Sequence, residues 1–351
     1  SKIISNIDRL NSILDKHKIK WTLVTKMLSG YKPVLEKLLC NDTIKNIHSV
    51  GDARISNLKA IKEVKPDIVT MYIKPPAIVQ AKNVVKYADI SLNSSYKTIE
   101  ALNREAEKQN KIHKVVVMIE MGELREGILR ENILSFYEKV FNMPNIEIIG
   151  LGTNLGCMYG VEPTYDKLIQ LSLYKQLIDS NFKTRLELIS SGSSITLPLI
   201  SKNKIPSEIN HFRIGETAFL GVSPYNGKKY KNLSTKAFDF SAEIIELEKK
   251  DLVPDGNIGE SGIGYTAEIE HLDTDELYRC IVDFGEIDVE VDNLSLKDPN
   301  LNFIGTTSDM TVYGFKDKTG KYKVGDQIHF TPNYMAVARI MNSRYITKKV
   351  I

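Results

Sequence analysis

The sequence has few cysteines, and their spacing excludes two kinds of stabilised site. Cys40, Cys157 and Cys280 are its three cysteines and lie far apart along the chain. They form neither a disulfide framework nor a paired zinc-binding motif. The six histidines show no clustered, ligand-like spacing either, so we predict no metal site.

The sequence also lacks a large charge excess and long apolar runs. Lys and Arg total 47 against 44 Asp and Glu, a net charge of +3 that is too small to indicate a nucleic-acid partner. No apolar run approaches the roughly 18 residues needed to cross a bilayer. Residues 1–18 are typical of an amphipathic helix rather than a signal peptide. With 351 residues, of which 42% are hydrophobic, we expect a cytoplasmic protein of two domains that binds neither nucleic acid nor a membrane.

The first 230 residues alternate between short apolar runs and helical segments. The apolar runs predict eight buried strands, at 21–24, 47–50, 68–72, 90–92, 115–119, 146–150, 186–189 and 211–214. Helical spacing of apolar residues occupies 53–61, after Asp52 as its expected cap, and 96–109, 131–141 and 165–178. Eight such α/β units favour a (β/α)₈ TIM-like barrel. No glycine-rich dinucleotide fingerprint follows the first strand, which disfavours the alternative, a doubly wound open sheet.

The last third of the chain has a different pattern. Apolar runs at 242–247, 279–282 and 327–330 are separated by turn signals at 255–257 and 317–320. This pattern indicates an antiparallel, all-β second domain. We place the boundary within Asn226–Thr235, which gives a barrel at 1–230 and a C-terminal β domain at 231–351.

Two loops after predicted strands carry hydroxyl groups and glycines. In a (β/α)₈ barrel the reactive groups lie at the carboxyl ends of the strands, and the loops after strands seven and eight are the usual phosphate site. Here those loops contain Ser190–Ser194 and Gly215–Thr217. Either loop alone is more simply an ordinary Ser/Gly turn, but the two together favour a phosphate site.

Lys26 follows the first predicted strand and should project toward the barrel mouth. A lysine whose charge is disfavoured by burial is a candidate nucleophilic amine, although a lone lysine at a strand end more often extends to solvent. A barrel-mouth lysine combined with a phosphate site and two arginines, Arg125 and Arg213, resembles the grip of enzymes on pyridoxal 5'-phosphate (PLP).

With these features the sequence resembles the fold-type III PLP enzymes, the alanine racemase superfamily, and is most similar to the ornithine racemase branch. The segments that carry the resemblance are 24–26, 88–94, 118–127, 150–155, 189–197, 210–216, 307–309 and 333–334. They lie in register along nearly the whole chain. The resemblance implies an amino acid racemase that interconverts L- and D-amino acids, including basic ones such as ornithine.

The resemblance also implies roles for individual residues. Lys26 would bind PLP covalently and act as one proton-transfer base. Arg125 would lie near the phenolic oxygen of the cofactor, Arg213 would contact its pyridine nitrogen, and Asn154 would lie against the face of its ring. The remaining cofactor contacts implied by the resemblance are Ser193, Ser194, Gly215 and Glu216 at the phosphate, with Tyr334 nearby.

The second base is where the sequence departs from the family. Alanine racemases have a tyrosine after a glycine in the C-terminal domain, and here Glu286 follows Gly285. Glu286, Asp288 and Asp309 are the candidates, and each is more simply a structural residue. In the family the second base comes from the partner subunit, which implies a head-to-tail homodimer. The family also has a β-strand before its first helix, so we expect that this numbered chain lacks a first strand.

Three other functions compete with the racemase. A fold-type III decarboxylase would carry a cysteine-centred motif near the cofactor, whereas Cys280 lies in an apolar run typical of a core residue. A non-catalytic PLP-binding protein would resemble the barrel alone. A cofactor-free barrel hydrolase would use Glu120 and Glu123, but two acids at this spacing are usually solvated or paired.

Overall fold

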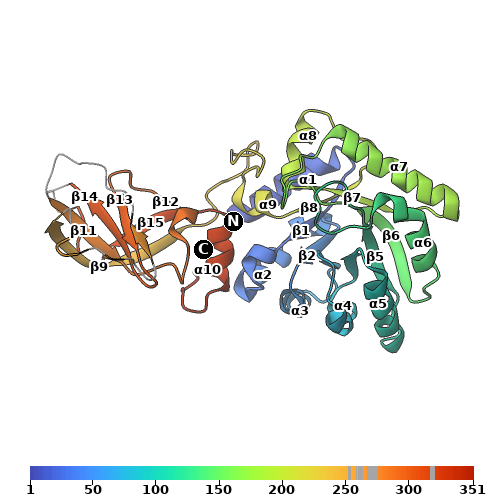
Figure 1. The fold of residues 1–351 in the computed structure, drawn as a ribbon, viewed down its shortest axis with the longest axis horizontal. Helices are drawn as coiled ribbons and strands as arrows, with labels where there is room; N and C mark the ends of the chain where they lie inside the picture. The colour runs from blue at the N-terminus through green and yellow to red at the C-terminus, as the bar shows by residue number, and fades with distance from the viewer. Residues whose placement is uncertain (252–253, 258, 260–263, 267–275, 317–320) are drawn as a thin grey trace. The chain divides into compact units, whose positions relative to one another are not determined.

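The computed structural model describes residues 1–251, 254–257, 259, 264–266, 276–316 and 321–351. These residues form two compact units: Ser1–Ala237 with Val350–Ile351, and Phe238–Lys349 (Figure 1). The turn predicted at 317–320 lies outside the described residues. In the described part of the chain, no helix has the length and apolar character needed to span a membrane.

The first unit contains a closed barrel of eight parallel strands in sequence order. Strand β8 pairs in parallel with β1, with Phe212 opposite Trp21, and this pairing closes the barrel. The predicted (β/α)₈ barrel is therefore confirmed. The strands are β1 (Lys20–Val24), β2 (Ser49–Asp52), β3 (Thr70–Tyr72), β4 (Ile90–Asn93), β5 (His113–Met118), β6 (Ile146–Gly152), β7 (Leu188–Ser193) and β8 (His211–Ile214).

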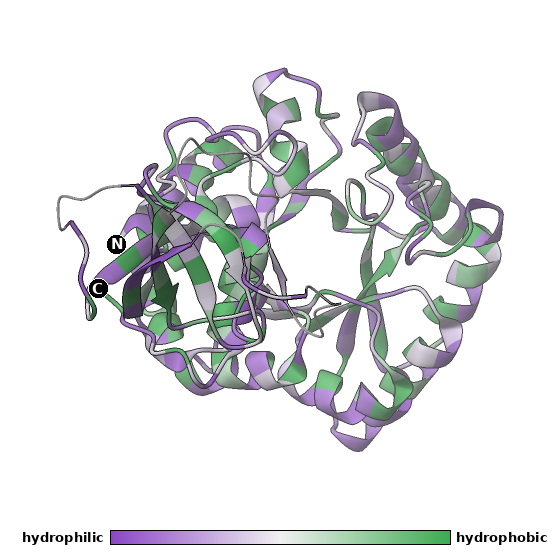
Figure 2. Ribbon diagram, turned by 60° about the vertical axis from the view of Figure 1, so that its left-hand side comes forward, coloured by the Kyte–Doolittle hydropathy of each residue, from purple (hydrophilic) through white to green (hydrophobic). Residues whose placement is uncertain are grey.

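Helices surround these strands, each with an apolar face toward the barrel. In α5 (Tyr96–Lys108), the buried residues include Ile99, Leu102 and Ala106, spaced as one face of a helix. Figure 2 shows the barrel strands as largely hydrophobic, whereas the helices carry residues of both kinds. The other helices of this unit are α1 (Lys2–Asp15), α2 (Lys32–Leu39), α3 (Ile55–Val64), α4 (Ala81–Tyr87), α6 (Ile133–Phe141), α7 (Tyr165–Phe182), α8 (Leu197–Ser201) and α9 (Glu216–Leu220).

The interior of the barrel has an apolar side and a polar side. The apolar side is a buried cluster from β3 to β7: Met71, Ile90, Leu92, Val116, Met118, Ile149 and Leu188. The polar side comprises buried residues of β1, β2, β7 and β8: Thr22, Ser49, Ser190, His211 and Arg213. Interiors of such barrels are ordinarily packed with branched apolar residues, so the polar side calls for a functional explanation.

The second unit is a seven-stranded antiparallel sheet, which confirms the predicted all-β domain. Its strand order is β10-β13-β14-β11-β9-β15-β12. Along β9 (Phe240–Asp251), buried Phe240, Ala242 and Ile244 alternate with exposed residues, and an aromatic core packs on that face. The other elements are β10 (Tyr265–Thr266), β11 (Glu276–Val282), β12 (Leu294–Leu296), β13 (Asn302–Thr306), β14 (Thr311–Phe315), β15 (Gln327–Pro332) and the helix α10 (Tyr334–Asn342).

Two barrel strands lie further along the chain than their apolar runs predict. Strand β2 is Ser49–Asp52 instead of 47–50, and β7 continues through Ser193. The parallel ladders of β2 include Ser49, Gly51 and Asp52, and those of β7 include Ser190, Gly192 and Ser193, residues with low intrinsic strand propensity. Pairing within the closed barrel overrides local preference at the strand ends, which are the positions that face the site.

Candidate functional site

Lys26 lies at the mouth of the barrel, directly after β1, as the first residue of a short 3₁₀ helix (Lys26–Leu28). The residue is exposed, so of the two alternatives for this lysine the structure favours the side chain that extends to solvent over the buried amine. Its neighbours on either side, Thr25 and Met27, are buried and fix the backbone at this point. The backbone at Lys26 is therefore held in place, while the side chain is exposed.

A buried carboxylate, Asp52, holds the backbone beneath Lys26. Its Oδ2 accepts a hydrogen bond from the hydroxyl of Thr25 (3.2 Å), and its Oδ1 accepts from Arg54 N and Asn57 Nδ2 (both 3.0 Å). It was expected to cap the next helix, but it ends β2 and Arg54 is the cap residue. Burial raises the pKa of Asp52 to about 6, although these hydrogen bonds oppose the shift.

Replacing Asp52 with asparagine should change how stability depends on pH. The folded-state pKa of about 6 lies above the ordinary 3.8, so the wild type loses stability as pH rises from about 4 to about 6. Two pKa units correspond to roughly 3 kcal/mol. In urea titrations between pH 4 and 6.5, we expect the wild type to lose about this much free energy of unfolding relative to Asp52→Asn. Asp67→Asn, at an exposed position, is the control; a difference independent of pH would contradict this account of Asp52.

Arg213 of β8 is buried and held by four hydrogen bonds. Its Nη1 donates to the backbone oxygen (2.6 Å) and the hydroxyl (2.5 Å) of Ser190, and its Nη2 donates to Thr153 O (2.8 Å) and Asn154 Oδ1 (2.7 Å). A guanidinium has five N–H groups, and Nε carries the fifth. Burial lowers the pKa of Arg213 to about 10, and nearby Glu126 opposes that shift, so the group stays charged at neutral pH.

Glu126 links the other predicted arginine to Asn154. Its carboxylate accepts hydrogen bonds from Nε and Nη2 of Arg125 and from Nδ2 of Asn154. Nη1 of Arg125 also contacts Sγ of Cys157, in the loop after β6. The structure therefore brings Arg125, Asn154 and Arg213 together around one carboxylate, and the hydrogen bond to Glu126 raises the pKa of Arg125.

Glu123 organises the loop that follows β6. Its buried carboxylate accepts five backbone N–H bonds, of 2.7–3.2 Å, from Gly156, Cys157, Tyr159, Gly160 and Val161. Burial alone would raise its pKa, but these bonds outweigh burial and lower it. Glu120 likewise accepts backbone N–H bonds, from Gly122, Leu124 and Arg125. Both carboxylates are committed to the backbone, which leaves no basis for the hydrolase alternative.

Glu123→Gln should release the loop after β6. A glutamine has only one acceptor oxygen. Its NH₂ group would face backbone N–H groups that in the wild type donate to the second carboxylate oxygen of Glu123. Leaving buried donors unpaired costs about 1–3 kcal/mol each. We expect a lower melting temperature and faster proteolysis within residues 155–161, with Glu131→Gln, on an exposed turn, as the control. Equal proteolysis of the two variants would show that Glu123 does not hold the loop.

The loops after β7 and β8 are joined at the predicted phosphate site. The hydroxyl of Ser194 accepts a hydrogen bond from Thr217 N (3.3 Å), while Ser193 and Thr196 form a capping box at the start of the next turn. A Cβ on Gly215 would lie 2.9 Å from Val24 O, so glycine allows this loop to approach the end of β1. Burial raises the pKa of Glu216, and the charge of Lys26 opposes that shift, which places Lys26 near this loop.

The candidate second bases lie in the second unit, as does Tyr334. Glu286 and Asp309 occupy adjoining turns, because Glu286 N donates to Thr307 O (3.0 Å) and a Cβ on Gly285 would overlap Asp309 N. The side chain of Asp309 is exposed and accepts from the hydroxyl of Ser308 (2.6 Å). Asp288 accepts from Gly285 N (3.3 Å) within its own turn. Tyr334 is the first residue of α10 and is half-buried.

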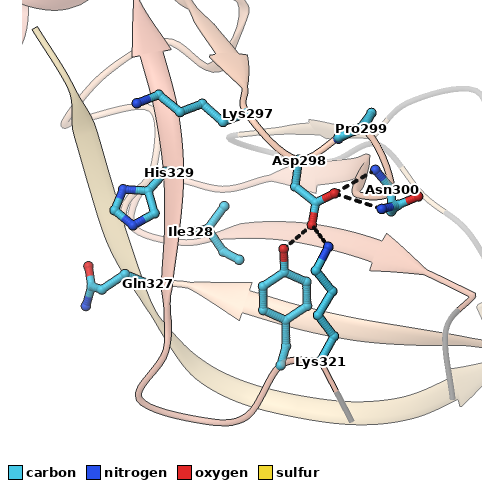
Figure 3. Close-up of a pocket in the computed structure, with 9 residues that line it drawn as sticks. Lys297, Asp298, Pro299, Asn300, Lys321, Gln327, Ile328 and His329 are labelled. Carbon is cyan, nitrogen blue, oxygen red and sulfur yellow. Dashed lines mark hydrogen bonds and ion pairs between the residues drawn. The ribbon is translucent and has the colours of Figure 1, made fainter. Parts of the chain in front are cut away.

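A pocket of about 400 Å³ in the second unit contains none of the predicted site residues (Figure 3). Its centre is Asp298, which accepts hydrogen bonds from Lys321, Tyr322 and Asn300. The bond from Lys321 in particular lowers the pKa of Asp298 well below its usual range. These contacts bind one loop to another, so we assign the pocket a structural role.

Sequence reasoning missed several residues of the barrel site. Glu126 had no predicted role of its own, Asp52 was expected only to cap a helix, His211 only to belong to a strand, and Ser190 only to belong to the phosphate loop. Their roles come from contacts between residues far apart in sequence, such as Arg213 with Asn154 and Asp52 with Thr25. A sign was available for His211: it begins a short barrel strand that also carries Arg213, and two polar residues at alternate positions share one face of that strand.

Comparison with known proteins gives a consistent result over the whole chain. The family model "Alanine racemase, N-terminal domain" matches residues 1–224. The chain is 32% identical to ornithine racemase of Acetoanaerobium sticklandii, over 100% of this chain and 98% of the relative. It is 29% identical to lysine racemase of Thermotoga maritima, over 99% and 95%. The fold matches alanine racemase of Bartonella henselae, solved with covalently bound pyridoxal phosphate, with a TM-score of 0.70, 14% identity and coverage of 98% and 96%.

Proposed function

The chain belongs to the alanine racemase family and is an amino acid racemase, and from this premise we propose that it uses PLP, bound through Lys26, to racemise a basic amino acid such as ornithine. The observation that carries the proposal is the set of residues at the barrel mouth. This set comprises Lys26, the two arginines and the joined loops after β7 and β8. Its members come from separate strand ends of one barrel, which we propose as the PLP-binding domain.

The residues present fit this cofactor. Four N–H groups of Arg213 donate to acceptors within the protein, and the fifth, on Nε, has no acceptor among the described residues, so it suits a pyridine nitrogen. The hydroxyl of Ser194 accepts from Thr217 N and keeps its own proton to donate to a phosphate, and Gly215 lets this loop lie close to the end of β1. Arg125 would lie at the phenolic oxygen and Asn154 at the ring face, with Ser193, Glu216 and Tyr334 completing the contacts.

When bound, PLP supplies an electron sink that makes the α-hydrogen of an amino acid acidic. The chain supplies the proton transfers: Nζ of Lys26 takes the α-proton on one face of the substrate, and a second acid returns one on the other face. Arg213, with no proton-accepting capacity, keeps the ring nitrogen unprotonated and so restrains side reactions. We propose Glu286 or Asp309 as the second acid, supplied by the partner subunit of a head-to-tail homodimer.

The substrate class follows from the relatives that match the whole chain. The ornithine and lysine racemases both act on amino acids with a second amino group, and both matches extend through the second unit. A carboxylate such as that of Glu286 or Asp309 could pair with that group. Racemisation should therefore be faster for ornithine and lysine than for alanine, measured by optical rotation and by loss of α-hydrogen to solvent deuterium. Equal rates, or a preference for alanine, would refute the proposed specificity.

Among the residues that the structure describes, no feature favours the competing PLP functions. The thiol of Cys280 is buried, donates to Tyr313 O (3.5 Å), and has its pKa raised by burial to about 11, as suits a core residue and not a decarboxylase acid. Release of carbon dioxide from ornithine would revive that alternative.

All three cysteines are free thiols, two of them exposed, which supports the proposed cytoplasmic location. Light scattering of the purified protein tests the proposed dimer.

A further inference from the structure

A chain of hydrogen bonds crosses the polar side of the barrel and ends on Arg213. Nη1 of Arg213 lies 2.5 Å from the hydroxyl oxygen of Ser190, which lies 2.7 Å from Nδ1 of His211. Nε2 of His211 lies 3.0 Å from the hydroxyl of Thr22, and that hydroxyl lies 2.7 Å from the hydroxyl of Ser49. All five residues are buried, and none of them is adjacent in sequence to the next.

Arg213 sets the direction of every proton in this chain, because a guanidinium only donates. The oxygen of Ser190 accepts from it, and Nδ1 of His211 is the acceptor within hydrogen-bond distance of that hydroxyl, so we orient the proton of Ser190 toward Nδ1 of His211. His211 is then protonated on Nε2 and donates to Thr22, and Thr22 donates to Ser49. In each hydrogen bond of this chain, the donor is the partner nearer to Arg213 and the acceptor is the partner farther from it.

This arrangement requires a neutral His211. A protonated ring would place a second donor on Ser190 and a second positive charge near Arg213. Burial lowers the pKa of His211 well below its usual 6.5, and nearby His48 and Arg213 lower it further. The aligned dipoles therefore present their negative ends to the guanidinium, and hydrogen bonds in such a chain strengthen one another.

We propose that His211 is a positioning residue for the racemase reaction: by directing the hydroxyl oxygen of Ser190 at Arg213, it fixes the guanidinium with Nε facing the site. The inference rests on the proposed function, in which Arg213 contacts the pyridine nitrogen of PLP. His211 itself touches neither substrate nor cofactor. Its effect reaches the reaction through the orientation and charge of Arg213.

The test compares His211→Leu with His113→Leu in the PLP-loaded enzyme. His113 is the matched control, because it is another buried barrel histidine bonded to a serine (Nε2 to Ser91 Oγ, 2.7 Å) and has no recorded contact with Arg213. The readouts are the racemisation rate per bound cofactor and the ratio of racemisation to transamination. A purely structural loss lowers the amount of loaded enzyme but leaves this ratio unchanged.

We expect His211→Leu to lower the rate and the ratio about tenfold or more, the effect of losing a hydrogen bond that supports a charged group. His113→Leu should keep the wild-type ratio. His211→Asn should restore the ratio to within about threefold of the wild type, since Oδ1 of asparagine takes the place of Nδ1 as acceptor. Should His211→Leu not fold, Ser190→Ala breaks the same link by removing one oxygen, and a lowered ratio is expected there too.

The outcomes separate this inference from the proposed function. If the wild type binds no PLP and racemises no amino acid, the proposed function fails and the inference fails with it. If the wild type racemises ornithine but His211→Leu, or Ser190→Ala in its place, keeps the ratio of His113→Leu, the inference alone is overturned.

Discussion

Lys26→Ala should abolish racemisation, with turnover at least about 1,000-fold below the wild type. The structure places this amine directly after β1, on a backbone fixed by buried neighbours and by the bond from Thr25 to Asp52. We therefore expect Lys26 to be both the covalent ligand and one base, two roles that an alanine cannot fill. The measurement is exchange of the α-hydrogen of ornithine in deuterium oxide.

The matched control for this variant is Lys20→Ala. Lys20 is exposed and begins the same strand, so it lies at the opposite end of β1 from Lys26. It should keep near-wild-type turnover. If Lys26→Ala retained more than about a tenth of the wild-type rate at full PLP loading, the assignment of Lys26 as a base would be wrong.

Arg213→Gln should have the second largest effect, and it should change the reaction outcome as well as its rate. Glutamine is neutral and cannot replace four N–H bonds to Ser190, Thr153 and Asn154. It also removes the fixed positive charge that we propose lies at the ring nitrogen. We expect racemisation to fall about 100-fold and transamination to take a larger share of turnover, because the ring nitrogen can then be protonated.

The two products can be followed in one experiment. Racemisation is measured by chiral chromatography of ornithine and transamination by formation of the keto acid. Arg104→Gln, an exposed arginine of α5 paired with Glu100, is the control and should match the wild type. An unchanged product ratio in Arg213→Gln would contradict the placement of this guanidinium at the ring nitrogen.

Much of the fold could be predicted from the sequence, because the barrel strands are short and continuously apolar. The run 211–214 coincides with β8, and the run 21–24 lies within β1. Prediction was poorest where a strand ends in polar residues, as in β2 with Gly51–Asp52 and β7 with Ser190–Ser193. There the hydrogen-bonded ladder of the closed barrel, and not the preference of each residue, decides the structure.

The same limit applies to the site. Residues at strand ends could be proposed from their positions, since all strands of a parallel barrel end at one mouth. The residues that support them could not be predicted, because their partners lie far away in the sequence. Glu126 and Asn154 are 28 residues apart, and His211 and Thr22 are 189 residues apart. The sequence also left open whether Lys26 is buried or extends into solvent, because a lysine just beyond a buried strand can do either, and the structure shows it exposed.

The most direct test of the account is reduction of the PLP-loaded protein with borohydride, followed by peptide mapping with mass spectrometry. Reduction makes the link between an amine and PLP permanent, so the labelled residue identifies the amine. The account predicts one labelled peptide, with the cofactor on Lys26. A label on any other lysine, or a protein that takes up no cofactor, would contradict it.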